Sequence, residues 1–470
     1  ATYNQTLKDA TPKGTAASPY NLANPGGNGA KNHIEETANC YLISAPGHYC
    51  IPLVYGNGVK NDVPNTNAYQ STQPAGTPYL LKFFKDHQDG NITNPYIGGQ
   101  LGGSAHTANV VWQDQPNLIR NASLRITYDG PNFVEFEVKK EDIRNGNAVI
   151  AIKRGGQIVW SWHLWFDHAD ALDKIPCKNY GGITYKFTRK TLGQVHIKYE
   201  KTSYDKPRKA RVTIEQQAAN GGVRASAPVV ITQNPENENQ MATTLYQFGR
   251  KDALPGTNTL ASGSSYSFDD TPGGHSIGYA IQHPEIHYRW FRNWTNGYKQ
   301  HNLWSINNTV TGYNNDAVVK TIYDPCPAGF QMPASRAFTG FTTNGIYAGT
   351  PSQINKNGAW DYGWHFNNKI SSPDATVYFP ASGWREWDYG RLQHAGEWGC
   401  YWSAIPYDEY EGCYLSFSKS TVSPISEIRR SYGIAVRPVA QQRPRVTPKT
   451  PGSSVEAWQE EELDGGHGRH

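Results

Sequence analysis

The segment formed by residues 148–166 constrains the fold of this chain more than any other stretch. Its two arms, 148–153 and 157–166, are rich in Val, Ile and Trp, and Arg154-Gly-Gly156 lies between them. β-Branched and aromatic residues favour strands, and two glycines supply the positive φ angles that a tight turn requires. The segment therefore predicts an antiparallel β-hairpin.

Further strand signals follow one another at short intervals on both sides of this hairpin. They lie at residues 41–43, 49–55, 109–112, 124–128, 133–138, 194–199, 210–215 and 228–233. Many short strands separated by polar turns are typical of a sandwich of two sheets. A charged content of 18%, below that of an average soluble domain, agrees with a chain of short strands and long polar turns. We therefore predict an all-β, or β-dominated, fold.

The polar stretch 234–239 contains a proline and predicts a boundary between two domains. Beyond it the amino-acid composition changes, because nine of the 14 Trp lie between Trp290 and Trp402 among Gly, Asn and Ser. We predict an immunoglobulin-like β-sandwich region over 31–235 and a loop-rich domain over 236–440. Residues 1–30 are predicted to form a flexible arm, or the remnant of a preceding domain, and 441–470 a disordered tail.

Charge and hydropathy exclude several classes of function. The net charge is +4 and we find no basic stripe, so a nucleic acid is not an expected partner. No run of 18 apolar residues is present, so we predict no membrane span. The chain begins at Ala1 without an initiator Met or a signal peptide. We expect that its first residue was set by proteolytic processing or by the choice of the expressed segment, and that a secretory leader preceded it.

Six cysteines are spread along the chain, at Cys40, Cys50, Cys177, Cys326, Cys400 and Cys413. None forms a Cys-x-x-Cys pair or has a histidine at zinc-finger spacing, so structural zinc is not expected. Cys40 and Cys50 flank one hairpin-like stretch, and Cys400 and Cys413 flank another. Disulfides across these hairpins and free buried thiols remain equal alternatives.

Motifs for nucleotide cofactors and for zinc proteases are absent from the sequence. It contains no phosphate-binding or dinucleotide-binding glycine pattern and no His-Glu-x-x-His. His163 and His168 are five residues apart on a predicted strand and point to opposite faces, which disfavours a shared metal. The acidic pairs Asp269-Asp270 and Asp408-Glu409 are interpreted as turn residues, with calcium binding as the alternative. We predict no metal, no cofactor and no enzymatic activity.

One aromatic run interrupted by charges is the candidate binding site. It comprises Trp384, Arg385, Glu386, Trp387, Asp388 and Tyr389, after one glycine and before another. Exposed Trp and Tyr rings stack on the apolar face of a sugar while neighbouring charges bind its hydroxyl groups. The alternative is that these rings pack a loop-rich core. A weaker candidate is the run from Tyr288 to Trp294, whose arginines are placed to stack on neighbouring rings.

Four segments in the second half carry a family resemblance. They are Tyr323-Asp-Pro-Cys-Pro-Ala-Gly-Phe-Gln-Met-Pro333, Phe379-Pro-Ala-Ser-Gly-Trp384, Gly399-Cys-Tyr-Trp-Ser403 and Gly433-Ile-Ala-Val-Arg437. In this order they resemble the Fibrobacter succinogenes major paralogous domain of Bacteroidetes surface proteins, which implies a C-type-lectin-like fold over 236–440. That family commonly has a Cys after the final Val-Arg, whereas this chain has Pro438, so a disulfide to Cys326 is in doubt.

The first half resembles the fimbrillin-like surface proteins of Bacteroidetes. The resemblance rests on the segments 36–47, 145–152 and 160–165, and the strands 210–215 and 228–233 are similar to closing strands of immunoglobulin-like modules. It implies secretion, an extracellular or cell-surface location and a role in fimbriae or adhesion.

Three functions follow as hypotheses. The first is a fimbria-associated adhesin that binds a glycan, or a host or bacterial surface protein, through its second domain. The second is a purely structural stalk or pilus component that contacts other fimbrial subunits. The third and weakest is an enzyme that acts on polysaccharides with paired carboxylates.

Overall fold

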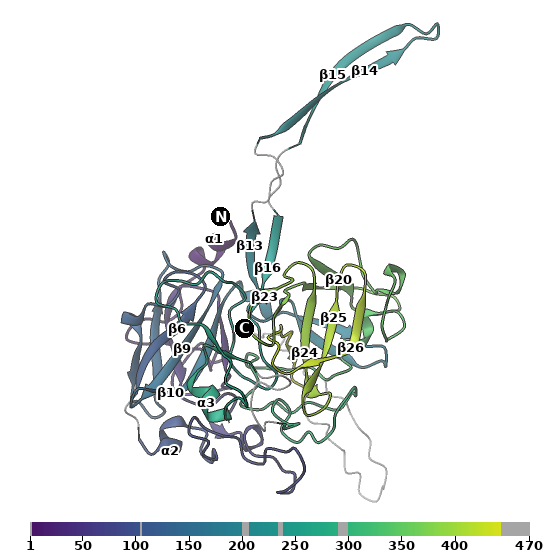
Figure 1. Ribbon diagram of the computed structural model, residues 1–470. Helices are drawn as coiled ribbons and strands as arrows, with labels where there is room; N and C mark the ends of the chain where they lie inside the picture. Colours follow the sequence, from purple (N-terminus) through teal and green to yellow (C-terminus); the bar gives the residue numbers. More distant parts are fainter. Residues whose placement is uncertain (1, 104–105, 200–205, 234–237, 290–298, 443–470) are drawn as a thin grey trace, which may run out of the picture. The chain divides into compact units, whose positions relative to one another are not determined.

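The computed structural model describes residues 2–103, 106–199, 206–233, 238–289 and 299–442. The chain divides into two compact units, one formed by residues 1–195 with 242–470 and the other by residues 196–241. The α-helices of the described residues are short: α1 (Thr2–Asp9), α2 (Ile97–Leu101) and α3 (Ile277–Gln282). Strands make up most of the regular structure (Figure 1), which confirms the prediction of a β-dominated fold.

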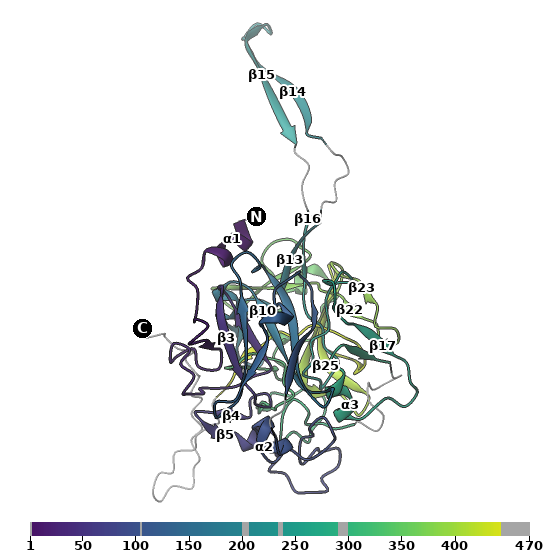
Figure 2. The same cartoon turned by 90° about the vertical axis from the view of Figure 1, so that its left-hand side faces the viewer.

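Two four-stranded sheets are built from the first part of the larger unit. One sheet has the order β1 (Tyr20–Asn21), β3 (Gly47–Pro52), β8 (Phe133–Val138) and β7 (Arg125–Thr127). The other has the order β2 (Cys40–Ile43), β10 (Gln157–Phe166), β9 (Gly146–Arg154) and β6 (Thr107–Gln113). Figure 2 shows β3 and β10, one from each sheet. The antiparallel pairing of β9 with β10 confirms the predicted hairpin.

The later strands form smaller sheets. A three-stranded sheet has the order β24 (Gly399–Pro406), β25 (Glu411–Phe417) and β26 (Val422–Arg429). The two-stranded sheets of this unit are β4 (Val59–Lys60) with β5 (Val63–Pro64), β17 (Ser267–Asp269) with β18 (Ile286–Tyr288), β20 (Gly363–Asn367) with β21 (Thr376–Pro380), and β22 (Trp384–Arg385) with β23 (Leu392–Gln393). Single-turn 3-10 helices lie at Thr66–Ala68, Asn121–Ser123, Ala169–Leu172, Thr339–Phe341 and Pro351–Gln353.

One sheet combines strands from both sides of the boundary predicted at 234–239. Its order is β11 (Lys174–Lys178), β12 (Thr184–Thr188), β27 (Val439–Ala440) and β19 (Phe330–Gln331). Phe187 pairs with Val439, and Phe330 pairs with Ala440. The described parts of 31–195 and 242–440 therefore belong to one compact unit. This differs from the division into two domains that the composition predicted.

Buried polar side chains join the same two halves. Arg437 is completely buried and donates through Nε to the backbone oxygen of Thr188 at 2.9 Å and through Nη2 to that of Arg189 at 2.7 Å. Burial lowers the pKa of Arg437 to about 10. Lys251, also buried, donates to Ser161 Oγ at 2.8 Å on β10. Buried polar groups are tolerated only when they are hydrogen-bonded. Because each of these side chains finds hydrogen-bond partners in the other half, the two halves must fold together.

The first thirty residues are packed, in contrast to the flexible arm that their composition predicted. Leu7 on α1 and Ala23 are fully buried, and Tyr20 pairs with Tyr49 of β3. The side chain of Asn21 accepts from the backbone N–H of Ala23 at 2.9 Å. Side-chain hydrogen bonds of this kind give an Asn-rich and Gly-rich segment a fixed path without a periodic apolar pattern. The predicted tail at 441–470 lies almost entirely outside the described residues.

The smaller unit contains a two-stranded ribbon formed by β14 (Arg208–Gln217) and β15 (Val223–Gln233) (Figure 1). A second pair, β13 (Val195–Tyr199) with β16 (Glu238–Ala242), lies at the two ends of the smaller unit in sequence. The segments 210–215 and 228–233 are strands, as predicted. They pair with each other in a sheet of their own and do not close the sheets of the region 31–235 among the described residues.

All six cysteines lie in the described part of the chain, and all are buried free thiols. Cys40 and Cys50 lie in different sheets, on β2 and β3. Burial raises the pKa of Cys50 and of Cys177 to about 12, because the thiolate loses its hydration. Of the two alternatives left open by the sequence, the structure contains the free thiols.

Candidate ligand-binding surface

The predicted site lies on a tight antiparallel turn between β22 and β23. Trp384 pairs with Gln393 and Arg385 pairs with Leu392, and the backbone N–H of Glu386 donates to the oxygen of Arg391 at 3.0 Å. Gly390 has a φ of +64°, and a Cβ there would lie 2.8 Å from Cγ of His287. Both the backbone conformation and the lack of space require glycine at this position.

Arg385 supports the turn from inside and does not face solvent. It is 1% exposed, and its guanidinium lies 4.1 Å from the ring centroid of Tyr266. Nη1 donates to the oxygen of Gly390 at 2.6 Å, and Nη2 donates to that of Pro255 at 2.6 Å. Burial lowers the pKa of Arg385 from its usual value. Arg385 is therefore a positioning residue, which corrects its sequence-based interpretation as an exposed ligand contact.

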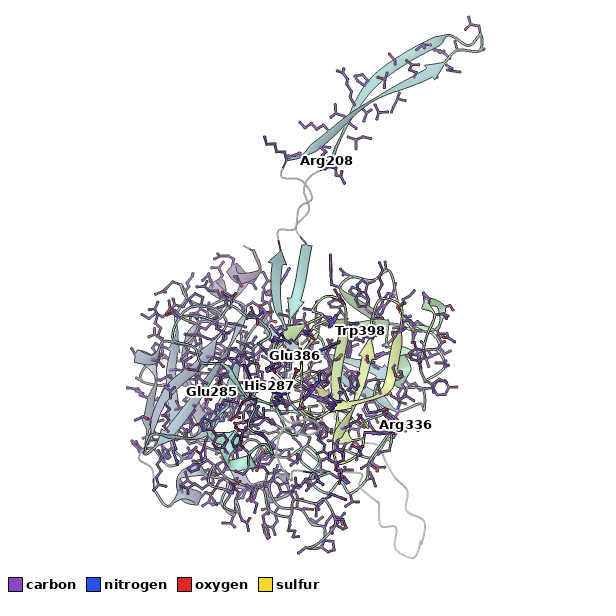
Figure 3. All side chains as sticks on the ribbon, viewed as in Figure 1. Arg208, Glu285, His287, Arg336, Glu386 and Trp398 are labelled. Atoms are coloured by element: carbon purple, nitrogen blue, oxygen red, sulfur yellow. The ribbon has the colours of Figure 1, made fainter. Side chains whose placement is uncertain are left out.

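Glu386 is also withdrawn from solvent, with 8% of its surface exposed. Its carboxylate forms an ion pair with the guanidinium of the exposed Arg391. This pair lies across the turn and fixes the direction of the Arg391 side chain. Glu386 and His287, both labelled in Figure 3, belong to the turn and to β18, respectively.

The exposed part of the turn is Tyr389, which pairs with a ring from a distant segment. The rings of Tyr389 and Phe268 meet edge to face with centroids 5.5 Å apart, and the two residues are 41% and 45% exposed. The guanidinium groups of Arg289 and Arg391 lie 5.0 Å and 5.5 Å from the centroid of Tyr389. We call Phe268, Arg289, Tyr389 and Arg391 the aromatic–guanidinium surface.

The remaining predicted residues lie at the border of this surface. Trp384 is half-buried, and its ring centroid lies 4.6 Å from that of His394. Trp387 is also half-buried, with the guanidinium of Arg429 at 4.8 Å from its centroid. Asp388 accepts from the backbone N–H of Tyr389 at 2.9 Å and so shapes the turn. The two tryptophans combine packing with partial exposure, between the two alternatives considered from the sequence.

A buried layer under the turn holds the surface in place. His287 is fully buried, and burial together with the nearby Arg385 lowers its pKa to about 3. Tyr266 donates to the backbone oxygen of Gly390 at 3.0 Å. β17 and β18 pair in parallel and bring Phe268 opposite His287. The short sheet β17–β18 lies beneath Gly390, and this position brings Phe268 and Arg289 next to Tyr389.

The sequence identified Tyr389 and missed Phe268, Arg289 and Arg391 as members of one surface. Arg391 lies two residues after the end of the aromatic run, and its charge, opposite to that of Glu386, could have indicated an ion pair. Phe268 gave no signal, since a single Phe in a polar segment is most simply interpreted as core. In the weaker candidate run, Tyr288 is buried and Arg289 does stack on a ring, whereas residues 290–294 lie outside the described residues.

The two histidines considered for metal binding have separate partners. His163 is buried on β10 with Nε2 at 2.7 Å from Asn147 Oδ1, and burial lowers its pKa to about 3. His168 has Nε2 at 2.8 Å from the backbone oxygen of Tyr3. Within the described ranges, no group of three or more His, Cys, Asp or Glu side chains is arranged to hold a metal ion.

The acidic pairs act in turns. Asp408 accepts from the backbone N–H groups of Tyr410 and Glu411 at 2.7 Å each, and Asp269 accepts from that of Thr271 at 2.8 Å. These are the local hydrogen bonds by which an aspartate closes a turn. They agree with the interpretation of these residues as turn residues.

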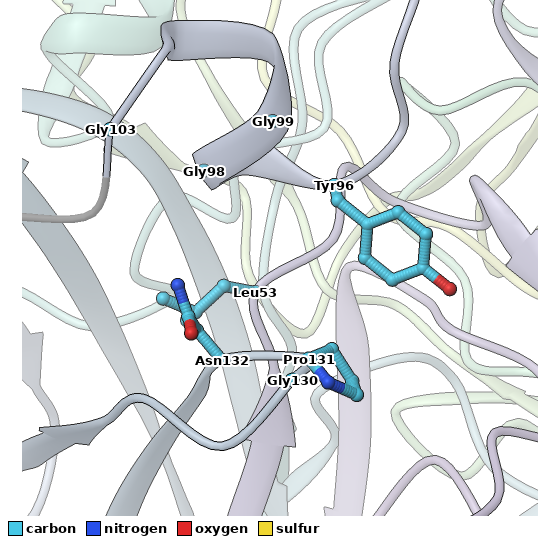
Figure 4. A pocket seen from close by; sticks show the side chains of 8 residues that line it. All are labelled: Leu53, Tyr96, Gly98, Gly99, Gly103, Gly130, Pro131 and Asn132. Carbon is cyan, nitrogen blue, oxygen red and sulfur yellow. The ribbon is translucent and has the colours of Figure 1, made fainter.

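A separate cavity of about 530 Å³ lies between α2 and the segment 130–132. Figure 4 shows its lining by the backbone of Gly98, Gly99, Gly103 and Gly130 and by the side chains of Leu53, Tyr96, Pro131 and Asn132. Among the described residues that line it, Tyr96 carries the only ionisable side chain, and the others are Leu, Gly, Pro and Asn. The described lining therefore supplies no pair of groups for acid–base or nucleophilic chemistry.

Comparison with known proteins gives one match. Residues 350–439 match the model of a family described as "Domain of unknown function (DUF8237)". No curated protein and no solved structure is significantly similar to the chain. The matched range contains Tyr389 and Arg391, whereas Phe268 and Arg289 lie outside it.

Across the part of the chain that the structure describes, no helix is long and apolar enough to cross a membrane.

Proposed function

We propose that the protein is an extracellular adhesin, at the cell surface or in a fimbria, that binds a glycan through the aromatic–guanidinium surface. The observation that carries this proposal is the edge-to-face pair of Phe268 and Tyr389, which are 45% and 41% exposed, with two guanidinium groups beside the ring of Tyr389. Exposed aromatic rings fixed by neighbours form a rigid contact area that loses little conformational entropy on binding.

The chemistry of this surface suits a sugar. The apolar face of a pyranose packs on an aromatic ring, while its hydroxyl groups accept from guanidinium donors. Tyr389 adds a phenolic hydroxyl that both donates and accepts. A rigid turn supports these groups, because Arg385 and Gly390 are fixed by the hydrogen bond between them.

Charge favours a neutral glycan over a strongly acidic one. Arg391 is paired with Glu386, and Arg289 has Nη1 at 3.9 Å from a carboxylate oxygen of Asp270. Asp388 adds a further carboxylate on the turn. The positive charges are therefore balanced locally, so the arginines act as hydrogen-bond donors to hydroxyl groups and do not form an anion site.

The sequence resemblances support the location and the class of function. The segments 323–333, 379–384, 399–403 and 433–437 resemble a C-type-lectin-like domain of Bacteroidetes surface proteins, and the first half resembles fimbrillin-like proteins. The second resemblance implies secretion and adhesion. A host or bacterial surface protein is the alternative ligand, since the same aromatic rings would also anchor a protein interface.

A structural role in an assembly is the second candidate function. It is favoured by one specific observation, the exposed ribbon of β14 and β15, in which every residue is exposed to solvent. A two-stranded ribbon rarely remains stable by itself in water.

A glycan array tests the proposal with the full chain, since β12 and β27 belong to one sheet and the two halves are not separable. Wild type is compared with Phe268→Ala and Tyr389→Ala, and with Tyr347→Ala as a matched control because Tyr347 is 55% exposed on another segment. We expect wild type and Tyr347→Ala to bind the same neutral sugar class, and each of the other two variants to lose most of the signal.

Equal binding by all four proteins would place the glycan site elsewhere. The absence of binding to any sugar, with the fold intact by circular dichroism, would overturn the glycan proposal and leave a protein ligand or the structural role.

A further inference from the structure

The register of β14 and β15 sorts the side chains of the ribbon onto two different faces. Residues that face each other in an antiparallel pair lie on the same side, and successive residues alternate. One face carries the pairs Ala210 with Ile231, Val212 with Val229, and Ile214 with Ala227. The opposite face carries the pairs Lys209 with Thr232, Arg211 with Val230, Thr213 with Pro228, and Glu215 with Ser226.

The first of these faces is apolar and exposed, and we call these six residues, Ala210, Val212, Ile214, Ala227, Val229 and Ile231, the apolar face. Ile214 is 59% exposed and Ile231 is 57% exposed. Antiparallel sheets normally pack one face against a core and leave the other in water. The alternation on this ribbon has that pattern, and the apolar face therefore requires a covering layer. Figure 3 shows the side chains of the ribbon, with Arg208 labelled at the start of β14.

The sizes of these side chains make the apolar face complementary to itself. Along β14 the order is Ala210, Val212, Ile214, and the residues paired with them on β15 have the reverse order of size, Ile231, Val229, Ala227. When a second ribbon is turned over and laid antiparallel on the first, the position of Ala210 meets Ile214 of the other ribbon. In the same arrangement Ile231 meets Ala227, and valine meets valine. Each large side chain then packs on a small one, as close packing of two layers requires.

We propose that β14–β15 binds the same ribbon of a second copy of this chain, apolar face to apolar face and antiparallel. A twofold axis relates the two ribbons, so one surface serves both copies. Two such ribbons form a small sandwich whose apolar faces are buried and whose Lys209 and Arg211 point outward.

Charge selects the antiparallel arrangement. Residues 206–233 carry a net charge of +4, and Arg208 is a charged residue on the same side of the ribbon as the apolar face, at one end of β14. In the antiparallel arrangement the two Arg208 side chains lie at opposite ends, about 25 Å apart by the rise of eight strand residues. This exceeds the Debye length of about 8 Å in physiological salt, so their repulsion is screened.

The interface is small, because a strand of this length spans only about 30 Å. It is below the standard size of about 800 Å² per partner, and we therefore expect a reversible dimer with a dissociation constant in the micromolar range. This assembly is independent of the aromatic–guanidinium surface and of glycan binding.

Sedimentation velocity of the full chain, from about 1 to about 200 µM, tests the proposal. We expect a monomer–dimer equilibrium in wild type. Val229→Asp should raise the dissociation constant more than about tenfold, since it buries an unpaired carboxylate. Val230→Asp is the matched control: the neighbouring valine is 58% exposed on the opposite face, and its variant should dimerise as wild type does.

A size exchange tests the packing without a charge. Ala227→Ile and Ile231→Ala should each weaken the dimer, and the double variant should restore it, because residues 227 and 231 meet across the interface only in the antiparallel arrangement. Circular dichroism of each variant checks that the ribbon is retained.

A monomer at all concentrations would overturn the proposal and would point to a different partner as the cover. A dimer that Val229→Asp leaves intact would also overturn it. Failure of the double variant to restore the dimer would exclude the antiparallel packing.

Discussion

Asn39 joins the two halves of the larger unit through its contact with Asp324. Its Nδ2 donates to the backbone oxygen of Asp324 at 2.9 Å and to that of Ile322 at 2.6 Å, while its Oδ1 accepts from Trp160 Nε1 at 3.0 Å. Asp324 in turn accepts from the backbone N–H of Cys326 at 2.7 Å. The Tyr323-Asp-Pro-Cys segment, known first as a sequence motif, is thus part of the core that holds β2 and β10.

Asn39→Ala should destabilise both halves together. The change leaves the indole N–H of Trp160 and two buried carbonyl oxygens without their partner, which costs about 2–4 kcal/mol. Chemical denaturation followed by fluorescence and by far-UV circular dichroism should show one coincident transition at a lower midpoint. Asn357→Ala, at an exposed position, is the control and should leave the midpoint unchanged. Two separate transitions would show that the two halves unfold independently and would contradict a single compact unit.

Arg385→Met should loosen the turn of the candidate site more than Arg391→Met does. Arg385 is buried and satisfies the oxygens of Pro255 and Gly390, so its loss should lower the free energy of unfolding by about 2–4 kcal/mol. Arg391 is exposed but pairs with the little-exposed carboxylate of Glu386, so its variant should lose less stability than Arg385→Met does. Hydrogen exchange of the amides in 386–391 measures the loosening. Equal exchange in both variants would show that Arg385 does not position the turn.

Protonation of His163 should destabilise the fold in acid. Its folded pKa is about 3, below the ordinary value of about 6.5, so the unfolded chain binds a proton in this range and the folded chain does not. Stability is therefore lost as the pH falls from about 6.5 toward 3, by about 1.4 kcal/mol per pH unit from this residue. His163→Gln should show a slope that is shallower by this amount in denaturation curves taken at pH 4–7. Parallel pH profiles would contradict the buried neutral state.

The sequence predicted the parts of the fold whose signals are local. The hairpin of β9 and β10 was visible because β-branched residues and the Gly155-Gly156 turn are adjacent in sequence. The packing of residues 1–30 was not, because it depends on backbone pairing such as Tyr20 with Tyr49 and on Asn side chains, which leave no apolar period. The union of the two halves was also hidden, since contacts such as that between Asn39 and Asp324 join residues far apart in sequence.

The candidate site shows the same division. Tyr389 could be predicted because it ends an aromatic run in a glycine-bounded turn. Arg385 and Arg391 have the same side chain on the same turn, and only the fold makes one of them buried and the other exposed. Phe268 reaches Tyr389 through the pairing of β17 with β18, which a list of residue types does not reveal.

The central claim is that Phe268 and Tyr389 form one glycan-binding surface, and a double-mutant cycle in calorimetric titration tests it most directly. The full chain, Phe268→Ala, Tyr389→Ala and the double variant are titrated with the sugar that gives the strongest array signal. We predict that each single variant weakens binding at least about tenfold and that the double variant is little weaker than either, because both rings contact one sugar. Unchanged affinity in both single variants, with folding intact, would contradict the claim.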